Sequence, residues 1–151
     1  MAMLNERLED LSFLYFIQNQ FLDFPGVAVV NAFPKVDLTT PTISVVAKSI
    51  ELFPGELGNA KQMAIRTWDI DVFAETITQR DEFAYRIINA LQYPVSVLDF
   101  NMGFPPTVTP SQLYCLKPQA IRMDNIDVDA ELVSKFYYRN WVNYTAYRDK
   151  L

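Results

Sequence analysis

The chain has 151 residues, of which half are apolar, and 18 acidic side chains against 13 basic ones give it a formal net charge of −5. This size and hydrophobicity predict a single folded domain over residues 1–151 and exclude a disordered chain. Because an acidic surface repels phosphate backbones, we do not expect a nucleic-acid-binding groove.

Two residue types that serve much of enzyme chemistry are scarce. Histidine is absent, and Cys115 is the only cysteine. The sequence therefore excludes His-based triads, Cys–His pairs, zinc sites built from these residues and an intrachain disulfide. Cys115 has apolar neighbours and is expected to be a buried filler. With no run long enough to span a bilayer and no signal pattern, we expect a soluble protein made and used in a reducing cytoplasm.

The first elements are a helix and a short strand. Residues 4–20 predict a helix that is apolar on nearly all sides, which is typical of a helix covered on more than one side. Its second cover is either the same domain or a neighbouring subunit. Phe24-Pro25-Gly26 ends this helix, and a valine-rich strand over 27–32 and a loop over 34–41 follow.

Two adjacent strands form the predicted centre of the sheet. Alternation predicts one strand over 42–51 and another over 63–75, the second with buried even-numbered positions and a solvated odd-numbered face. Between them, residues 52–59 have turn formers at both ends and predict a long hairpin loop. Its apolar Phe53 and Leu57 indicate a contact, either with another subunit or with the chain's own sheet.

A second helix follows the central strand. We expect it to begin at Thr78, with Asp81 in a capping-box-like position, and to end before Tyr93-Pro94. Its apolar residues share one side. They are Phe83, Ala84, Ile87, Ile88 and Leu91.

The C-terminal third alternates between strands and a long loop. Residues 95–101 predict a short edge strand, and the proline-rich stretch 102–112 predicts a loop of the length that often makes contacts. Alternation then predicts strands over 119–128 and 133–146. The last strand has aromatic residues on both faces, so its second face is covered by helices or by a partner. These residues are Tyr138 and Tyr144 on one face and Tyr137, Trp141 and Tyr147 on the other.

The element order is a helix, three strands, a helix and two or three strands. It predicts an α+β domain with a mainly antiparallel mixed sheet of about five to six strands. The N-terminal helix and the second helix are expected to pack on one face of this sheet.

One group of carboxylates could carry chemistry. Asp69, Asp71 and Glu75 lie on the polar face of the central strand, where alternate residues are about 7 Å apart. Carboxylates at this spacing can bind a divalent cation or divide acid and base roles, so a small metal-dependent enzyme is one alternative. Solvated carboxylates on a polar strand face are the simpler interpretation.

A second acidic run faintly resembles a calcium loop. It holds Asp124, Asn125, Asp127 and Asp129. The turn glycine and a glutamate at the closing position are missing, so a turn between two strands explains the run equally well.

Together these patterns resemble the bacteriophage tail terminator, or tail completion, proteins, which are small ring-forming subunits at the head–tail joint. The resemblance rests on the N-terminal helix, on Pro41-Thr42-Ile43-Ser44-Val45 opening a strand, and on Trp68-Asp69-Ile70-Asp71-Val72-Phe73-Ala74 running into the second helix. It covers about the first two thirds of the chain. The aromatic last strand and the loop over 102–110 have no counterpart in it, which leaves a related neck or connector protein open.

The resemblance implies a virion protein that forms a homo-oligomeric ring, commonly a hexamer, around the DNA channel. Such a ring stops tail-tube growth, contacts the tail tube protein and the neck or connector proteins, and lets DNA pass without specific binding. It implies no catalysis, cofactor, metal or membrane contact. A monomeric adaptor is a weaker alternative. The candidate interface residues are Phe53, Leu57, Phe104, Tyr137, Arg139 and Trp141.

Overall fold

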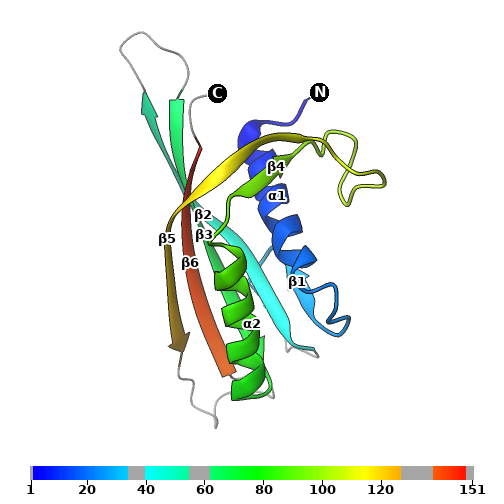
Figure 1. The fold of residues 1–151 in the computed structure, drawn as a ribbon, viewed down its shortest axis with the longest axis vertical. Coiled ribbons are helices and arrows are strands. Elements are labelled where there is room, and N and C mark those ends of the chain that lie inside the picture. Colours follow the sequence, from blue (N-terminus) through cyan, green and yellow to red (C-terminus); the bar gives the residue numbers. More distant parts are fainter. Residues whose placement is uncertain (1, 34–39, 55–61, 127–137, 149–151) are drawn as a thin grey trace.

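The computed structural model describes residues 2–33, 40–54, 62–126 and 138–148, which form two α-helices and one six-stranded sheet (Figure 1). The strand order is β1-β2-β3-β6-β5-β4. Only β1 and β2 pair in parallel, and the other neighbours are antiparallel, which confirms the predicted α+β class. The elements are α1 (Asn5–Asn19), β1 (Ala28–Val30), β2 (Thr42–Pro54), β3 (Gln62–Ala74), α2 (Ile77–Ala90), β4 (Val95–Leu98), β5 (Gln112–Ile126) and β6 (Tyr138–Arg148).

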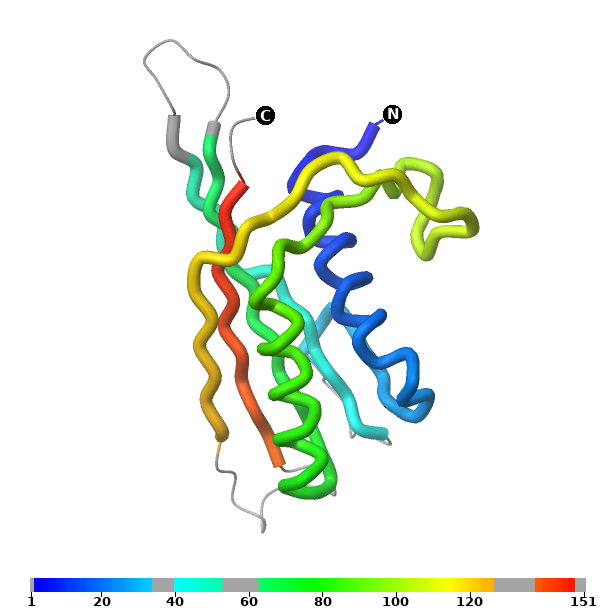
Figure 2. Tube along the Cα trace, viewed as in Figure 1, coloured from blue at the N-terminus to red at the C-terminus, as the bar shows by residue number. Residues whose placement is uncertain are grey.

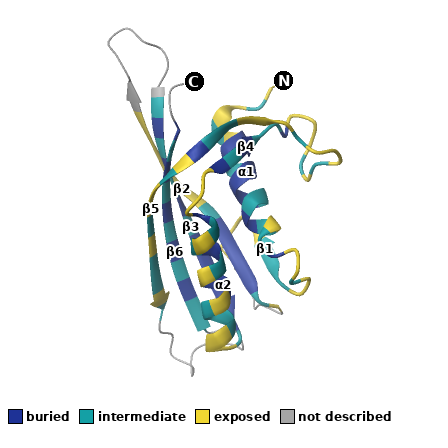
Figure 3. Cartoon of the chain, viewed as in Figure 1, coloured by how far each residue is buried: buried dark blue, intermediate teal, exposed yellow. Residues whose placement is uncertain are grey.

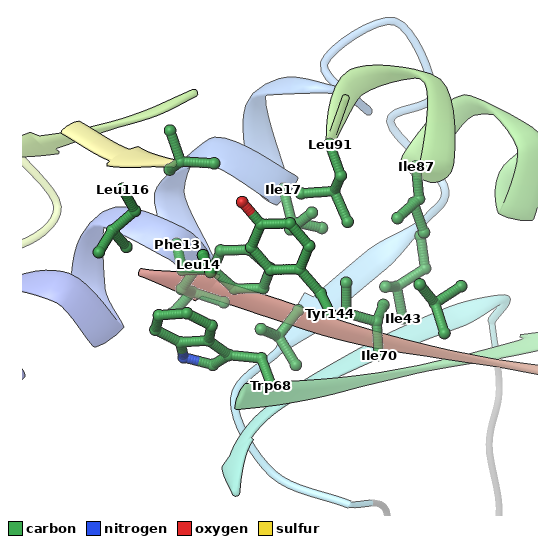
Figure 4. Packing of buried hydrophobic residues seen from close by; sticks show 14 of the residues in the cluster. Phe13, Leu14, Ile17, Ile43, Trp68, Ile70, Ile87, Leu91, Leu116 and Tyr144 are labelled. Carbon is green, nitrogen blue, oxygen red and sulfur yellow. The ribbon is translucent and has the colours of Figure 1, made fainter. Parts of the chain in front are cut away.

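Both helices pack on the same face of the sheet, as predicted (Figures 1 and 2). The ring of Phe13 on α1 stacks on Trp68 of β3 at 4.6 Å and on Tyr144 of β6 at 5.2 Å between ring centroids (Figure 4). From α2, Phe83 and Ile87 enter the same core. No helix among the described residues has the length and apolar character that crossing a membrane requires.

The domain itself provides the second cover of α1. The ring of Tyr15 packs edge-on against Phe100, which follows β4, with 5.4 Å between centroids. The helix therefore lies between the sheet on one side and β4 with its following segment on the other. This explains its apolar residues on several sides without a neighbouring subunit.

The central strand has the predicted alternation but not the predicted solvated face. Every even-numbered side chain of β3 from Ala64 to Ala74 is buried. On the odd-numbered face, Asp71 and Phe73 are buried too, so the expectation of a fully solvated face was wrong. The reason is that the Arg139 guanidinium of β6 lies 4.7 Å from the centroid of the Phe73 ring and covers it.

Several predicted boundaries also differ from the structure. Strand β2 continues to Pro54, which pairs with Gln62, so residues 52–54 extend the hairpin strand and do not belong to its loop. Strand β5 begins at Gln112 and not near residue 119, because its first residues pair with β4. Residues 127–137 lie outside the described part of the chain, so the predicted start of the last strand at residue 133 does too.

The start of α2 was predicted two residues too late. Thr76 is the N-cap, and its Oγ1 accepts a hydrogen bond from the Gln79 backbone N–H at 3.1 Å. The Gln79 side chain in turn accepts from the Glu75 backbone N–H at 3.0 Å. This reciprocal pair satisfies two backbone donors at the helix start. Asp81 instead contacts its neighbour Arg80 at 3.0 Å.

Two smaller expectations changed as well. Cys115 is partly exposed and accepts a hydrogen bond from Gln112 Nε2 at 3.0 Å, so it is not a buried filler. In the suggested calcium loop, Asp124 pairs with Arg122 at 3.0 Å, and Asn125 accepts a hydrogen bond from Asn140 at 2.7 Å. Asp127 and Asp129 lie outside the described residues.

A buried charge cluster, unforeseen from the sequence, joins α1 to three strands. The fully buried Glu9 carboxylate accepts hydrogen bonds from Arg66 of β3 at 2.7 Å, Arg148 of β6 at 3.0 Å and the Tyr114 hydroxyl of β5 at 2.6 Å. Beside it, Asp10 accepts from Arg66 at 2.6 Å. Burial and the Glu9 carboxylate raise the pKa of Tyr114, so its hydroxyl stays protonated and donates.

Arg148 is the second cation of this cluster. Burial, the largest single effect, disfavours its charge, but the Glu9 carboxylate and the Tyr114 side chain together outweigh burial and raise the pKa of Arg148 above its ordinary value. Arg148 therefore remains a cation inside the fold. The Glu9 carboxylate accepts hydrogen bonds from both guanidinium groups and the phenol, whereas the Nε atoms of Arg66 and Arg148 are buried without a hydrogen-bond partner among the described residues.

Replacing Glu9 with leucine is expected to lower the free energy of unfolding by roughly 3 kcal/mol, because two buried guanidinium groups lose their shared carboxylate. This is the low end for a broken buried pair, since Asp10 and Glu6 still contact Arg66 and Arg148. Urea unfolding followed by tryptophan fluorescence measures it. The matched control is Glu82→Leu on the exposed side of α2, expected to change stability by less than about 0.5 kcal/mol. Equal losses in the two variants would contradict the importance of the cluster.

Candidate interaction surface

The face of the sheet opposite the helices carries polar and aromatic side chains from β3 and β6. Because successive side chains of a strand alternate between faces, the odd-numbered residues of both strands lie here. We call it the helix-free face. Where β3 and β6 pair, its residues are Ile65, Thr67, Asp69, Asp71 and Phe73 on β3 and Arg139, Trp141, Asn143, Thr145 and Tyr147 on β6.

The two aspartates on this face are paired with cations. Asp69 lies 3.7 Å from Lys48 Nζ and accepts a hydrogen bond from Asn143 at 2.9 Å. Asp71 accepts from Arg139 at 3.3 Å. Burial raises the pKa of Asp71, an effect that Arg139 opposes and the nearby Asp69 reinforces.

These contacts bear on the suggested metal site. Across the described residues, no group of three or more His, Cys, Asp or Glu side chains is arranged to hold a metal ion. Asp69 and Asp71 share the helix-free face as predicted, but each forms an ion pair with a basic side chain. Glu75 lies just beyond the end of β3, where its backbone N–H donates a hydrogen bond to the Gln79 side chain. This arrangement favours a network of surface ion pairs over a metal site.

Aromatic rings and guanidinium groups complete the helix-free face. Besides covering Phe73, Arg139 lies 5.3 Å from the centroid of the Phe33 ring. Arg122 of β5 lies 6.0 Å from the Trp141 ring. Stacked guanidinium groups lose little further freedom when a partner docks, so such a face is suited to binding a protein. Arg139 and Trp141, two predicted interface residues, are thus two positions apart on one strand of one face.

The other predicted interface residues are placed elsewhere. Phe104 packs edge-on against Phe100 at 5.1 Å and against Tyr15 at 6.3 Å between centroids, so its ring anchors the segment over 99–111 to the domain. Phe53 lies on β2 opposite Met63. Leu57 and Tyr137 lie outside the described residues.

The segment over 99–111 exposes apolar side chains beyond this anchor. Met102 and Val108 are both largely exposed, and the segment projects from the domain beside α1 (Figure 3). Gly103 between these residues has φ of +127°, a conformation that side chains disfavour. A projection held by an aromatic base with apolar residues beyond it is suited to contacting another surface.

Strand β2 also exposes apolar side chains near the hairpin. Ile50 and Leu52 are 42% and 47% exposed, although their partners on β3, Arg66 and Ala64, are buried. The β2–β3 hairpin extends past the layer formed by the helices, so its helix-side residues are left uncovered (Figure 1). The sequence interpretation placed contacts in the hairpin loop over 52–59, which includes Leu52, and missed Ile50, although the alternation that marks the strand runs up to it.

The buried charge cluster is marked in the sequence by charged residues at positions whose pattern predicts burial. Arg66 occupies an even-numbered position of β3 among buried residues, and Glu9 interrupts an apolar helix. Two opposite charges at positions predicted to be buried must find each other, because a buried charge without a partner is costly.

No known protein-family model matches this sequence, and no curated protein matches it. The functional interpretation therefore rests on the geometry above and on the residue patterns.

About 5 mM Mg²⁺ or Ca²⁺ is expected to leave the melting temperature within about 1 °C, because Lys48 and Arg139 already neutralise the carboxylates of the helix-free face. Thermal unfolding of the wild type and of Asp71→Asn, each with and without metal, checks this. A rise of several degrees in the wild type that Asp71→Asn removes would instead support the metal-dependent alternative.

Proposed function

We propose that this chain is a structural subunit of a bacteriophage virion that assembles into a ring at the head–tail joint. The ring ends the growth of the tail tube and provides the surface on which the head docks. The proposal rests first on the resemblance to tail terminator proteins, and the geometry of the subunit supports it.

The observation that carries the proposal is that one small domain exposes several separate surfaces with aromatic, apolar or ion-paired side chains suited to protein contacts. The helix-free face presents Trp141 and Arg139 in a lattice of paired charges. The β2–β3 hairpin exposes Ile50 and Leu52, and the segment over 99–111 exposes Met102. Both projections extend beyond the core at the end where α1 begins (Figure 2). A ring subunit needs contacts to two neighbours and to partners above and below it, which explains several such surfaces.

The charge of the chain supports the same role. A net charge of −5 suits a channel wall that DNA passes without adhering. Few basic side chains are available to displace counterions from the phosphates, so contact with DNA gains little free energy. On the helix-free face the cations near Asp69 and Asp71 are held in internal pairs, so they offer little attraction to a phosphate backbone.

A related neck or connector protein is the second candidate. The segment over 99–111, with its anchored Phe104 and exposed Met102, has no counterpart in the tail terminator resemblance and favours a distinct docking partner. The two candidates share the ring and differ in whether the ring binds tail tubes or the portal side of the head.

Light scattering on a sizing column, at several protein concentrations, is expected to show a species of about six 17.4 kDa subunits. Added to growing tail tubes, this species is expected to cap their ends and fix their length in electron micrographs. Binding to heads but not to tubes would select the neck candidate. A chain that stays monomeric at every concentration and on tube ends would contradict the proposal.

A further inference from the structure

The sheet formed by the described residues has two open strand edges on its opposite sides. Strand β1 pairs with β2 only as far as Ser44, so within the described residues the rest of β2 pairs with β3 alone. Strand β4 pairs with β5 only as far as Leu116, and from Lys117 onward β5 pairs with β6 alone in the described part of the chain. Figure 1 shows this second half of β5 at the outer edge of the sheet. An open edge offers unpaired backbone groups to another chain.

The directions of the two edges are compatible. The strands β2, β3, β6 and β5 are neighbours in this order, and each pair is antiparallel. The edges β2 and β5 therefore run in opposite directions. When a second copy is rotated about a ring axis and placed beside the first, its β2 meets the neighbour's β5 antiparallel, and the alternation continues. Such a contact joins two different edges, so it repeats head-to-tail and can close a ring.

Resting on the ring function proposed above, we propose that β2 of one subunit pairs antiparallel with β5 of the next, with Glu51 opposite Arg122. Both residues belong to the helix-free face, since Glu51 pairs with Ile65 and Arg122 with Asn143 inside the subunit. Glu51 is exposed, and the Arg122 side chain is 73% exposed. The contact places opposite charges directly across the joint.

The same register matches apolar residues on the other face. Counting one residue back on β2 and one forward on β5 places Ile50 opposite Met123. The next pair on that face is Leu52 opposite the neighbour's Ile121. Ile50 and Leu52 are half exposed in the subunit, and Ile121 and Met123 are only partly buried against the core. Pairing would therefore cover apolar surface that the isolated subunit leaves in water.

Other registers fit less well. A slip of one residue turns the apolar side chains of one strand to the charged face of the other. A slip of two residues in one direction places Glu51 opposite Asp124, which sets like charges against each other. The irregularities at Ala47/Ser49 on β2 and at Pro118/Ala120 on β5 interrupt regular pairing at one end of each open stretch.

A disulfide test follows from this register. In a Cys115→Ser background, Leu52→Cys and Ile121→Cys are expected to crosslink neighbouring subunits, because opposed residues have Cα atoms about 4.5–5.5 Å apart. Within one subunit the two positions lie three strand spacings apart, about 14 Å across the sheet, and four residues apart along β6, which is too far for a disulfide. Oxidised samples on non-reducing gels should show a ladder that ends at the ring size. Ladder formation supports the contact, whereas a product that stops at dimers contradicts it.

The controls for this test use the same residues. Each single cysteine variant is expected to give no ladder. A mismatched pair, Leu52→Cys with Tyr85→Cys on the exposed side of α2, is likewise expected to give none. A ladder from the mismatched pair equal to that of the matched pair would overturn the proposed register.

A charge exchange tests the contact on the helix-free face independently. Glu51→Arg and Arg122→Glu are each expected to weaken assembly about tenfold, and the double variant to restore it, because the exchange reverses the charges but keeps them opposite. Circular dichroism of the subunit should stay unchanged in all three. The matched control is Glu82→Arg, the same charge change on α2, which should leave assembly unaffected.

The outcomes separate the two proposals. A wild-type ring without the ladder and without the charge rescue contradicts the edge contact but leaves the ring function standing. A wild type that never assembles contradicts the ring function itself, and the edge contact with it.

Discussion

The buried carboxylate of Glu9 is the interaction on which the arrangement of this domain depends. It ties α1 to β3 through Arg66, to β6 through Arg148 and to β5 through Tyr114. A buried carboxylate without these partners would be strongly unfavourable, so α1 has one well-defined position over the sheet. That position sets Phe13 between Trp68 and Tyr144, which is the centre of the apolar core (Figure 4). Charge satisfaction and aromatic packing thus select the same placement.

The two halves of β5 have different neighbours, and this difference decides where the described sheet has an open edge. Tyr114 belongs to the first half of β5, which pairs with β4 over α1, whereas the second half pairs with β6 beyond the irregularity at Pro118/Ala120. Because β4 has only four residues, it covers only the first half of β5, and among the described residues the other half pairs with β6 alone. With both helices on one face, the opposite face is left to Asp69, Asp71 and their basic partners. The surfaces available for assembly are therefore consequences of how the core is built.

These open surfaces are consistent with the proposed role as a ring subunit. The paired charges of the helix-free face, the uncovered Ile50 and Leu52 and the anchored segment over 99–111 each offer a surface to a neighbour. In the proposed ring, such surfaces would have separate uses: edges would join subunits, while projections and faces would meet the tube, the neck and the channel. The proposed edge contact would extend the sheet from one subunit into the next and give the ring a continuous hydrogen-bonded sheet.

The sequence by itself determined the periodic features: the α+β class, the buried even-numbered face of β3, the core side of α2 and both helices on one face. These follow from the spacing of apolar residues, which local geometry converts directly into faces. The tertiary structure alone decided the partners of Glu9, the division of β5 between β4 and β6, the burial of Asp71 and Phe73, and the edges left open. Arg148 lies 139 positions from Glu9 along the chain. Contacts of that separation depend on how all elements pack together, so no local pattern specifies them, and the same holds for the surfaces that the packing leaves uncovered.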